Sequence, residues 1–282
     1  MAKFEYINSF DENKIRVAIY EPSSKPTGII QIVHGFGEGI GHYDEVADFF
    51  TKHGLTCIMH DQRGFGLMED KTPKEKEYAR GVVPAYDYFL KDINVLKKQI
   101  KKWYGNLPIY LFGHSMGGNI VANYLMEYPQ DEYKKAILEA PWLRLYEPFP
   151  VFLRNLAKFI GNISGNIAIK SNLKKEYITR NKDRTTIMNS DGIFHTRMSI
   201  KLFHEISEAG EHVIENAEKI KIPSLLLCPG EEKIVCPKAI REFSTKTGDN
   251  FKYIEYPGGY HCLHSDIISE EVLNDILNFI LN

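Results

Sequence analysis

The sequence has little of what marks several classes of protein. Its 282 residues include four cysteines and no Cys-x-x-Cys pair, so we expect neither a disulfide framework nor a cysteine-based metal site. No run approaches the roughly 18–20 apolar residues of a membrane-spanning helix. The formal net charge is −2, with no basic excess for nucleic acid. The first six residues carry charge and no apolar run, so we expect no secretory signal and a place in the reducing cytoplasm.

Short apolar runs alternate with amphipathic stretches along most of the chain. Two alternating runs, at 4–9 and 14–20, predict an antiparallel pair at a sheet edge. Six further runs predict strands covered on both faces: 28–33, 55–59, 109–112, 136–138, 224–228 and 253–256. Helical patterns lie between them, at 43–53, 82–102, 118–128, 237–245 and 270–281. The order predicts an α/β fold: an eight-stranded, mostly parallel sheet with helices on both faces.

This alternation stops between residues 141 and 218. The segment contains helical patterns and no convincing central strand. Open α/β sheets bind ligands outside the carboxyl ends of their strands, and we expect the segment to cover that edge. We therefore predict a core built from residues 1–140 and 219–282, with a helical cap inserted at 141–218.

A nucleophile motif, Gly-His-Ser-Met-Gly, occupies positions 113–117. An apolar run precedes it and a helical pattern follows it, which is the strand–turn–helix context that G-x-S-x-G requires. A serine in so tight a turn has strained dihedral angles, and glycines two positions away avoid collisions with the neighbouring backbone. The helix N-terminus behind the serine favours negative charge. We predict that Ser115 is a catalytic nucleophile.

The chain resembles the monoacylglycerol lipase and lysophospholipase branch of the α/β-hydrolases, a serine aminopeptidase S33-type group. Four motifs carry the likeness: His-Gly-Phe-Gly-Glu at 34–38, Asp-Gln-Arg-Gly-Phe-Gly at 61–66, Gly-His-Ser-Met-Gly-Gly at 113–118 and Gly-Tyr-His-Cys-Leu-His at 259–264. The resemblance spans nearly the whole chain and is weakest across the predicted cap. It implies the α/β-hydrolase fold and cleavage of a carboxylic ester through an acyl-enzyme.

The resemblance also implies an oxyanion hole. His34 and Gly35 directly follow the predicted strand 28–33, where this fold supplies its second oxyanion donor. The donors would be the backbone N–H groups of Phe36 and Met116. His34 is expected to brace this loop rather than to act as a second base.

The base and the acid should follow the last two strands, because α/β-hydrolases order their triad as serine, acid, histidine. The family pattern selects His261 as the base rather than His264. The family normally has an aspartate in the segment that reads Gly-Glu-Glu-Lys-Ile-Val here, at 230–235, and aligning Lys-Ile-Val puts Glu232 at its position. Glutamate can orient an imidazole, although its longer side chain should pair more loosely. Glu231 and then Asp249 are the alternatives.

The substrate has to be inferred from the predicted cap. Apolar residues of segment 148–160 fall on one side of a helical pattern, and they give the predicted pocket residues Phe149, Phe152, Leu156 and Phe159. Such a face lines an acyl pocket, rests on a lipid interface or packs on the core. With the resemblance, we expect a monoacylglycerol or lysophospholipid substrate, transient contact with a membrane surface, no metal or organic cofactor and no obligate protein partner.

Three other functions remain open at this point. Two are enzymatic: a short-chain carboxylesterase and an S33-type aminopeptidase, which would need an acidic cluster to hold the substrate ammonium group. The third is a non-catalytic ligand-binding protein of the same fold, which can retain the triad residues.

Overall fold

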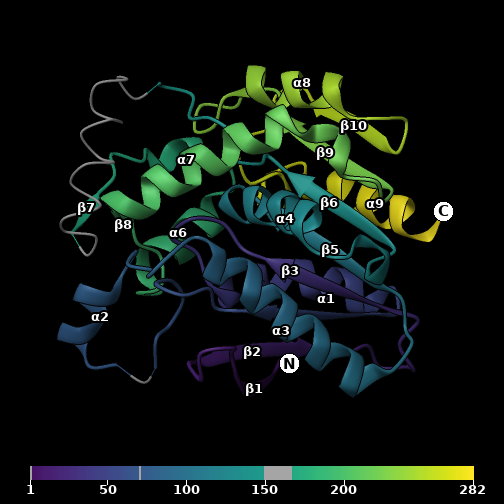
Figure 1. Cartoon of the computed structure of the whole chain (residues 1–282), viewed down its shortest axis with the longest axis horizontal. Coiled ribbons are helices and arrows are strands. Elements are labelled where there is room, and N and C mark those ends of the chain that lie inside the picture. The colour runs from purple at the N-terminus through teal and green to yellow at the C-terminus, as the bar shows by residue number, and fades with distance from the viewer. Residues whose placement is uncertain (1, 70, 149–166) are drawn as a thin grey trace.

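A mixed sheet forms the centre of the computed structural model, which describes residues 2–69, 71–148 and 167–282. The sheet has eight strands in the order β1-β2-β4-β3-β5-β6-β9-β10 (Figure 1). β1 (Lys3–Asn8) and β2 (Lys14–Tyr20) form an antiparallel hairpin, and β2 is also antiparallel to β4. All other neighbours in this sheet are parallel. The predicted sheet is confirmed.

The parallel strands are short and largely buried. They are β3 (Gly28–Val33), β4 (Leu55–His60), β5 (Ile109–His114), β6 (Lys135–Glu139), β9 (Ser224–Pro229) and β10 (Phe251–Tyr256). Every residue of β3, β4 and β9 is buried, because helices cover both faces of the sheet. This burial explains why these strands are continuous apolar runs in the sequence.

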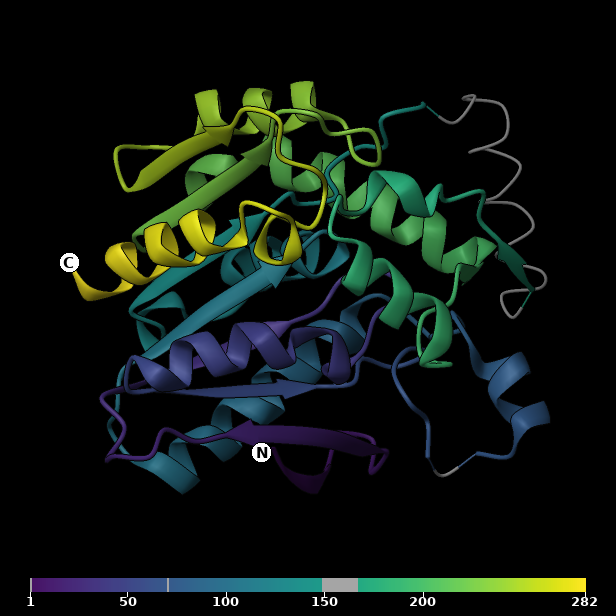
Figure 2. The same ribbon diagram turned by 180° about the vertical axis from the view of Figure 1, so that it is seen from behind.

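The helices divide the apolar core into two halves. α1 (Asp44–Lys52) and α9 (Ser269–Leu281) cover one face of the sheet (Figure 2). α3 (Asp87–Tyr104), α4 (Met116–Glu127) and α8 (Pro237–Lys246) cover the other. The helix predicted at 82–102 corresponds to α3, which begins at Asp87, five residues later than expected. A separate short helix, α2 (Pro73–Ala79), precedes it and starts with a capping box between Thr72 and Glu75.

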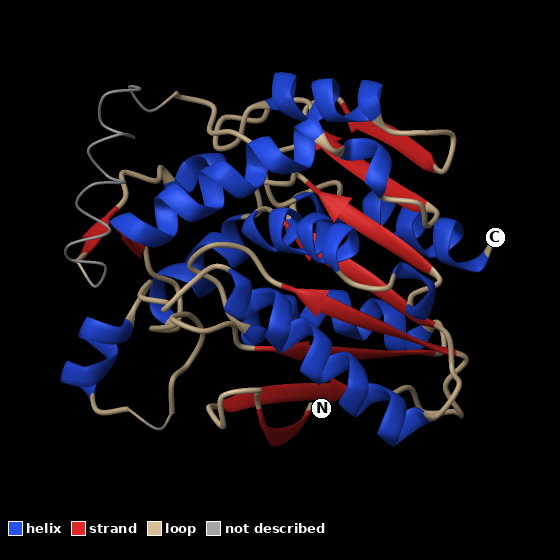
Figure 3. Cartoon of the chain, in the orientation of Figure 1, coloured by secondary structure: helices blue, strands red, loops and turns tan. Residues whose placement is uncertain are grey.

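The described part of the segment between β6 and β9 lies beyond the carboxyl ends of the central strands (Figure 3). Its described part contains α6 (Lys182–Ser190) and α7 (Ile200–Glu215), and α7 packs against α4 and α8. It also contains β7 (Ala168–Lys170) and β8 (Arg197–Ser199), an antiparallel pair separate from the main sheet. We expected helical patterns and no central strand here, and this pair does not join the central sheet; strands of three residues are too short to show a period in the sequence.

The connections include five turns of 3-10 helix: η1 (Ile40–Tyr43), η2 (Gln130–Glu132), η3 (Lys175–Tyr177), η4 (Ala217–Lys219) and η5 (Leu263–Ser265). Among the described residues, none of the helices has both the length and the apolar character needed to cross a bilayer.

Candidate active site

Ser115 stands at the sharp turn between β5 and α4. Its backbone has φ 54° and ψ −115°, a region that side chains rarely adopt. A Cβ atom on Gly113 would come 2.5 Å from the carbonyl oxygen of Gly117, and one on Gly117 would come 2.1 Å from that of Val33. Only glycine fits these two positions, because β5, α4 and the end of β3 approach one another so closely.

A hydrogen-bonded chain links the serine to the two residues predicted with it. His261 Nε2 lies 2.8 Å from Ser115 Oγ, and His261 Nδ1 lies 2.7 Å from Glu232 Oε2. His261 follows β10 and Glu232 follows β9, so parallel strands bring both to the carboxyl edge of the sheet. All three residues are at most 4% exposed. The hydroxyl can donate to one ring nitrogen while the other ring nitrogen donates to the carboxylate.

Main-chain groups hold the Glu232 carboxylate in place. The N–H groups of Ile234 and Val235 donate to Oε1 over 2.7 and 3.1 Å, which leaves Oε2 facing His261. The short turn after β9 thus folds the longer glutamate side chain back. The looser pairing that we expected for glutamate is not observed.

The other two candidates for the acid lie apart from His261. Glu231 is exposed, and its N–H group donates to the carbonyl oxygen of Gly259 over 3.0 Å. Asp249 is exposed in the turn that precedes β10, at the amino ends of the parallel strands. Among the hydrogen bonds of the described residues, neither carboxylate contacts the imidazole of His261.

His34 braces the loop that follows β3. The peptide N–H of Gln62 donates to Nε2 over 3.0 Å, and Nδ1 lies 2.9 Å from the carbonyl oxygen of Gly35. Burial lowers the pKa of His34, which favours a neutral ring with its proton on Nδ1. Both ring nitrogens are therefore occupied, as a bracing role requires.

The two predicted oxyanion donors flank the nucleophile. Met116 is the buried first residue of α4, and Phe36 lines the same cavity as Ser115. The Phe36 ring packs edge-on against Trp142, with 6.2 Å between the ring centroids. These positions suit two backbone donors that point at one oxygen, and their role stays a prediction.

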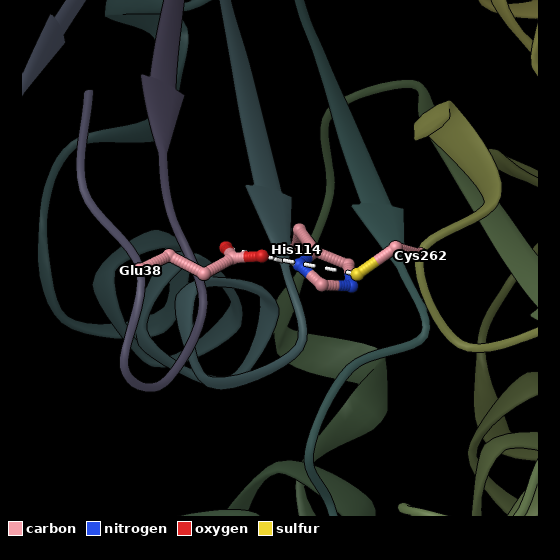
Figure 4. Close-up of side chains that lie close together, drawn as sticks. All are labelled: Glu38, His114 and Cys262. Atoms are coloured by element: carbon pink, nitrogen blue, oxygen red, sulfur yellow. Dashed lines mark hydrogen bonds and ion pairs between the residues drawn. The ribbon is translucent and has the colours of Figure 1, made fainter. Parts of the chain in front are cut away.

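A buried polar cluster of Glu38, His114 and Cys262 was missed in the sequence analysis (Figure 4). The cluster lies next to His261. The His114 ring is 4.9 Å from the rings of both His261 and His264, centroid to centroid. His114 Nδ1 lies 3.4 Å from Glu38 Oε2, and Cys262 Sγ lies 3.8 Å from Glu38 Oε1. The residues come from three distant motifs, so no spacing in the sequence shows that they meet.

Charges balance within this cluster. Burial disfavours charge on His114, but the Cys262 sulfur and the Glu38 carboxylate hold its pKa well above the usual value. Burial also opposes ionisation of Glu38, yet the histidines nearby, His114 first, hold the pKa of this carboxyl well below its usual value. His264 Nδ1 lies 2.8 Å from Glu139 Oε1. His264 is thus a satisfied polar residue.

A cavity of about 620 Å³ opens from the serine. This size is typical of pockets for small ligands. Its wall is largely apolar and includes Phe36, Trp142, Leu145, Ile178, Met198 and Phe203. Three lysines, Lys170, Lys174 and Lys233, also line it. The predicted pocket residues Phe149, Phe152, Leu156 and Phe159 lie outside the described residues.

Comparison with known proteins places the chain in a family. Residues 24–267 match the family described as serine aminopeptidase, S33. The chain belongs to this family. The predicted α/β-hydrolase fold and the likeness to the monoacylglycerol lipase branch are confirmed by this match and by the relatives.

Three relatives illustrate the likeness. The rat monoglyceride lipase is 27% identical over 262 residues, which cover 92% of this chain and 82% of the relative. A Schizosaccharomyces pombe relative is 28% identical over 247 residues; the match covers 85% of this chain but only 63% of that protein's length. The crystal structure of Paleococcus ferrophilus monoacylglycerol lipase superposes with a TM-score of 0.83 at 25% identity, over 95% of this chain and 99% of the other.

Proposed function

We propose that this S33-family protein is a serine ester hydrolase that cleaves a monoacylglycerol through an acyl-enzyme. The observation that carries the proposal is the chain of 2.8 and 2.7 Å contacts from Ser115 through His261 to Glu232, on a strained turn that opens into an apolar cavity. Such an arrangement activates a serine hydroxyl for nucleophilic attack.

The proposed cycle transfers the acyl group to water. His261 takes the Ser115 proton while the oxygen attacks the ester carbonyl, and the N–H groups of Phe36 and Met116 hold the oxyanion. Loss of one such donor typically costs about 2.7–4 kcal/mol in the barrier. Protonated His261, stabilised by Glu232, then gives its proton to the departing alcohol. The same imidazole next activates the water that releases the fatty acid and restores the serine.

The apolar wall of the cavity supports a substrate with a hydrocarbon chain. Relatives of this chain are named monoglyceride lipases, which fits the same proposal. The cavity is also lined by Lys170, Lys174 and Lys233. Their ammonium groups can pair with a phosphate group, which makes a lysophospholipid the second candidate substrate. The same lysines disfavour an aminopeptidase, since a substrate ammonium group would be repelled.

We further infer that residues 141–218 form a cap over a core of residues 1–140 and 219–282. The position of α6 and α7 beyond the carboxyl ends of the strands supports this division. A cap beside an apolar cavity also fits transient contact with a membrane surface during uptake of a lipid. Location in the cytoplasm remains a prediction from the sequence.

A substrate panel tests the proposal. The purified protein would be offered a long-chain monoacylglycerol, a lysophospholipid, a p-nitrophenyl short-chain ester and an aminoacyl anilide. We expect the highest kcat/KM for the monoacylglycerol and no turnover of the anilide. Labelling of wild-type protein by a fluorophosphonate, with none of the Ser115→Ala variant, would identify the nucleophile. Labelling without turnover of any ester would instead favour a non-catalytic ligand-binding protein.

A further inference from the structure

Three side chains that commonly ligate metals meet beside the nucleophile: Glu38, His114 and Cys262 (Figure 4). All three are buried, and their ligand atoms lie within 4.8 Å of one another. Glu38 comes from the loop after β3, His114 is the last residue of β5 and Cys262 follows β10. All three line the active-site cavity. An ion that enters this cavity can therefore reach them.

The separations between their atoms approach those of ligands around one zinc ion. Zinc bonds of about 2.0–2.3 Å in a tetrahedron place neighbouring ligand atoms roughly 3.3–3.6 Å apart. His114 Nδ1 is 3.4 Å from Glu38 Oε2, and Cys262 Sγ is 3.8 Å from Glu38 Oε1. With one ligand atom from each residue, the three atoms lie within 4.8 Å of one another, so the cluster would have to contract by up to about 1 Å to surround an ion.

The surroundings of the other His114 nitrogen provide a second, independent argument. His114 Nε2 is buried without a hydrogen-bond partner among the described residues, and so is Glu139 Oε2. His114 Nε2 lies 3.9 Å from Glu139 Oε1. A metal-bound histidine usually directs its second N–H group at a carboxylate. An ion on Nδ1 would leave the proton on Nε2, facing Glu139.

We propose that Glu38, His114 and Cys262 form a zinc-binding site whose occupation slows the hydrolase. The set of sulfur, nitrogen and oxygen donors suits zinc better than magnesium or calcium, which prefer oxygen alone. Binding requires the Cys262 thiol and the Nδ1 group of protonated His114 each to release a proton to solvent. Glu38 Oε2 accepts the N–H of Gly35 over 2.7 Å, and Gly35 precedes Phe36 in the oxyanion loop. An ion bound to Glu38 would disturb this hydrogen bond and so slow turnover.

Zinc binding is measured on metal-free, full-length protein by competition with a chromogenic indicator. The test compares wild type with Cys262→Ala and with a matched control, Cys236→Ala, whose cysteine is half-buried and outside the cluster. We expect one tight site per chain in wild type and in the control, and affinity lower by roughly 100-fold or more in Cys262→Ala. Equal affinity in all three proteins would overturn the site.

Cobalt provides a spectroscopic check of the sulfur ligand. A cobalt ion bound at the site should give a thiolate charge-transfer band in the near ultraviolet in wild type and in Cys236→Ala, and none in Cys262→Ala. Cys262→Ser serves as a second variant, and thermal unfolding shows that each protein is folded. A cobalt complex of wild type without this band would exclude Cys262 as a ligand.

The inhibitory part rests on the proposed function, whereas the binding part does not. Binding is therefore repeated in the Ser115→Ala background, where turnover plays no part. For inhibition, zinc should slow wild type and Cys236→Ala at one ion per chain, and Cys262→Ala only at roughly 100-fold more zinc, each relative to its own metal-free rate. Zinc that binds at this site without slowing ester turnover would overturn the inhibitory part alone.

Discussion

Two histidines three residues apart, His261 and His264, have nearly the same first partner and different surroundings. His261 Nδ1 lies 2.7 Å from a buried Glu232, and His264 Nδ1 lies 2.8 Å from a buried Glu139. The two histidines differ in what surrounds the rest of each ring. His261 directs its second nitrogen at Ser115 over 2.8 Å.

The His264 ring is enclosed by aromatic groups instead. It stacks on Tyr43, with 4.8 Å between centroids and 19° between the ring planes, and it meets Phe112 edge-on. A buried histidine–carboxylate pair is therefore no sign of catalysis on its own. What the second nitrogen faces distinguishes a general base from a structural residue, and substitutions on the two sides should separate the roles.

The largest expected effect falls on the catalytic side. Ser115→Ala and His261→Ala should each lower kcat by roughly 10⁶-fold, since members of a triad act as a unit. Each variant should keep the wild-type circular dichroism spectrum. Ester hydrolysis under saturating substrate provides the measurement. Equal losses of kcat in His261→Ala and His264→Ala would reopen the assignment of the base.

Substitution of the triad acid should give the next largest loss of kcat. Glu232→Gln keeps the shape of the side chain but favours the wrong tautomer of His261, and we expect a loss of about 10⁴-fold in kcat. Glu231→Gln is the matched control, since it makes the same chemical change on the neighbouring exposed residue. Its kcat should equal that of wild type. A wild-type rate in Glu232→Gln would exclude Glu232 as the acid.

A substitution of His264 should lower the free energy of unfolding rather than kcat. His264→Ala removes the hydrogen-bond partner of the buried Glu139 carboxylate, and leaving a buried carboxylate without its partner typically costs about 3–5 kcal/mol. The free energy of unfolding in urea measures this loss. The folded fraction should keep kcat within about tenfold of wild type. A variant as stable as wild type would contradict a structural role for the pair.

The strands of the sheet and the three residues of the proposed triad could be predicted from the sequence, whereas the buried partner of His264 could not. Every predicted strand of the main sheet exists: buried parallel strands such as β3, β4 and β9 are apolar runs, and the edge hairpin of β1 and β2 shows an alternating pattern. Ser115 was predicted from a local motif and His261 and Glu232 from the family pattern, and the structure brings the three side chains together. The pair of His264 with Glu139 was not predicted, because Glu139 is the last residue of an ordinary buried strand and nothing near it in sequence indicates a polar partner.

The proposed zinc ligands illustrate the same limit. We expected no metal site because the sequence shows no cluster with ligand spacing, yet Glu38, His114 and Cys262 converge in space. Metal-site motifs are recognised when ligands lie close together in the chain. Here the three residues are far apart in the sequence, with several strands and helices between them, and only the fold brings them together.

The smallest expected effect concerns acid stability. Burial opposes ionisation of Glu139, but His264 and then His114 together lower the pKa of this carboxyl below its ordinary value of 4.5. A carboxyl with a lowered pKa in the folded state stabilises the fold above its unfolded pKa, and this contribution disappears as pH falls through the folded pKa. Glu139→Gln should therefore lower the free energy of unfolding by about 1–3 kcal/mol near neutral pH and by progressively less in acid. Urea unfolding of both proteins across this range measures the difference, with Glu231→Gln as the exposed control. A constant difference down to the most acidic folded sample would show that the charge on Glu139 plays no part, and the pair with His264 would then act through packing alone.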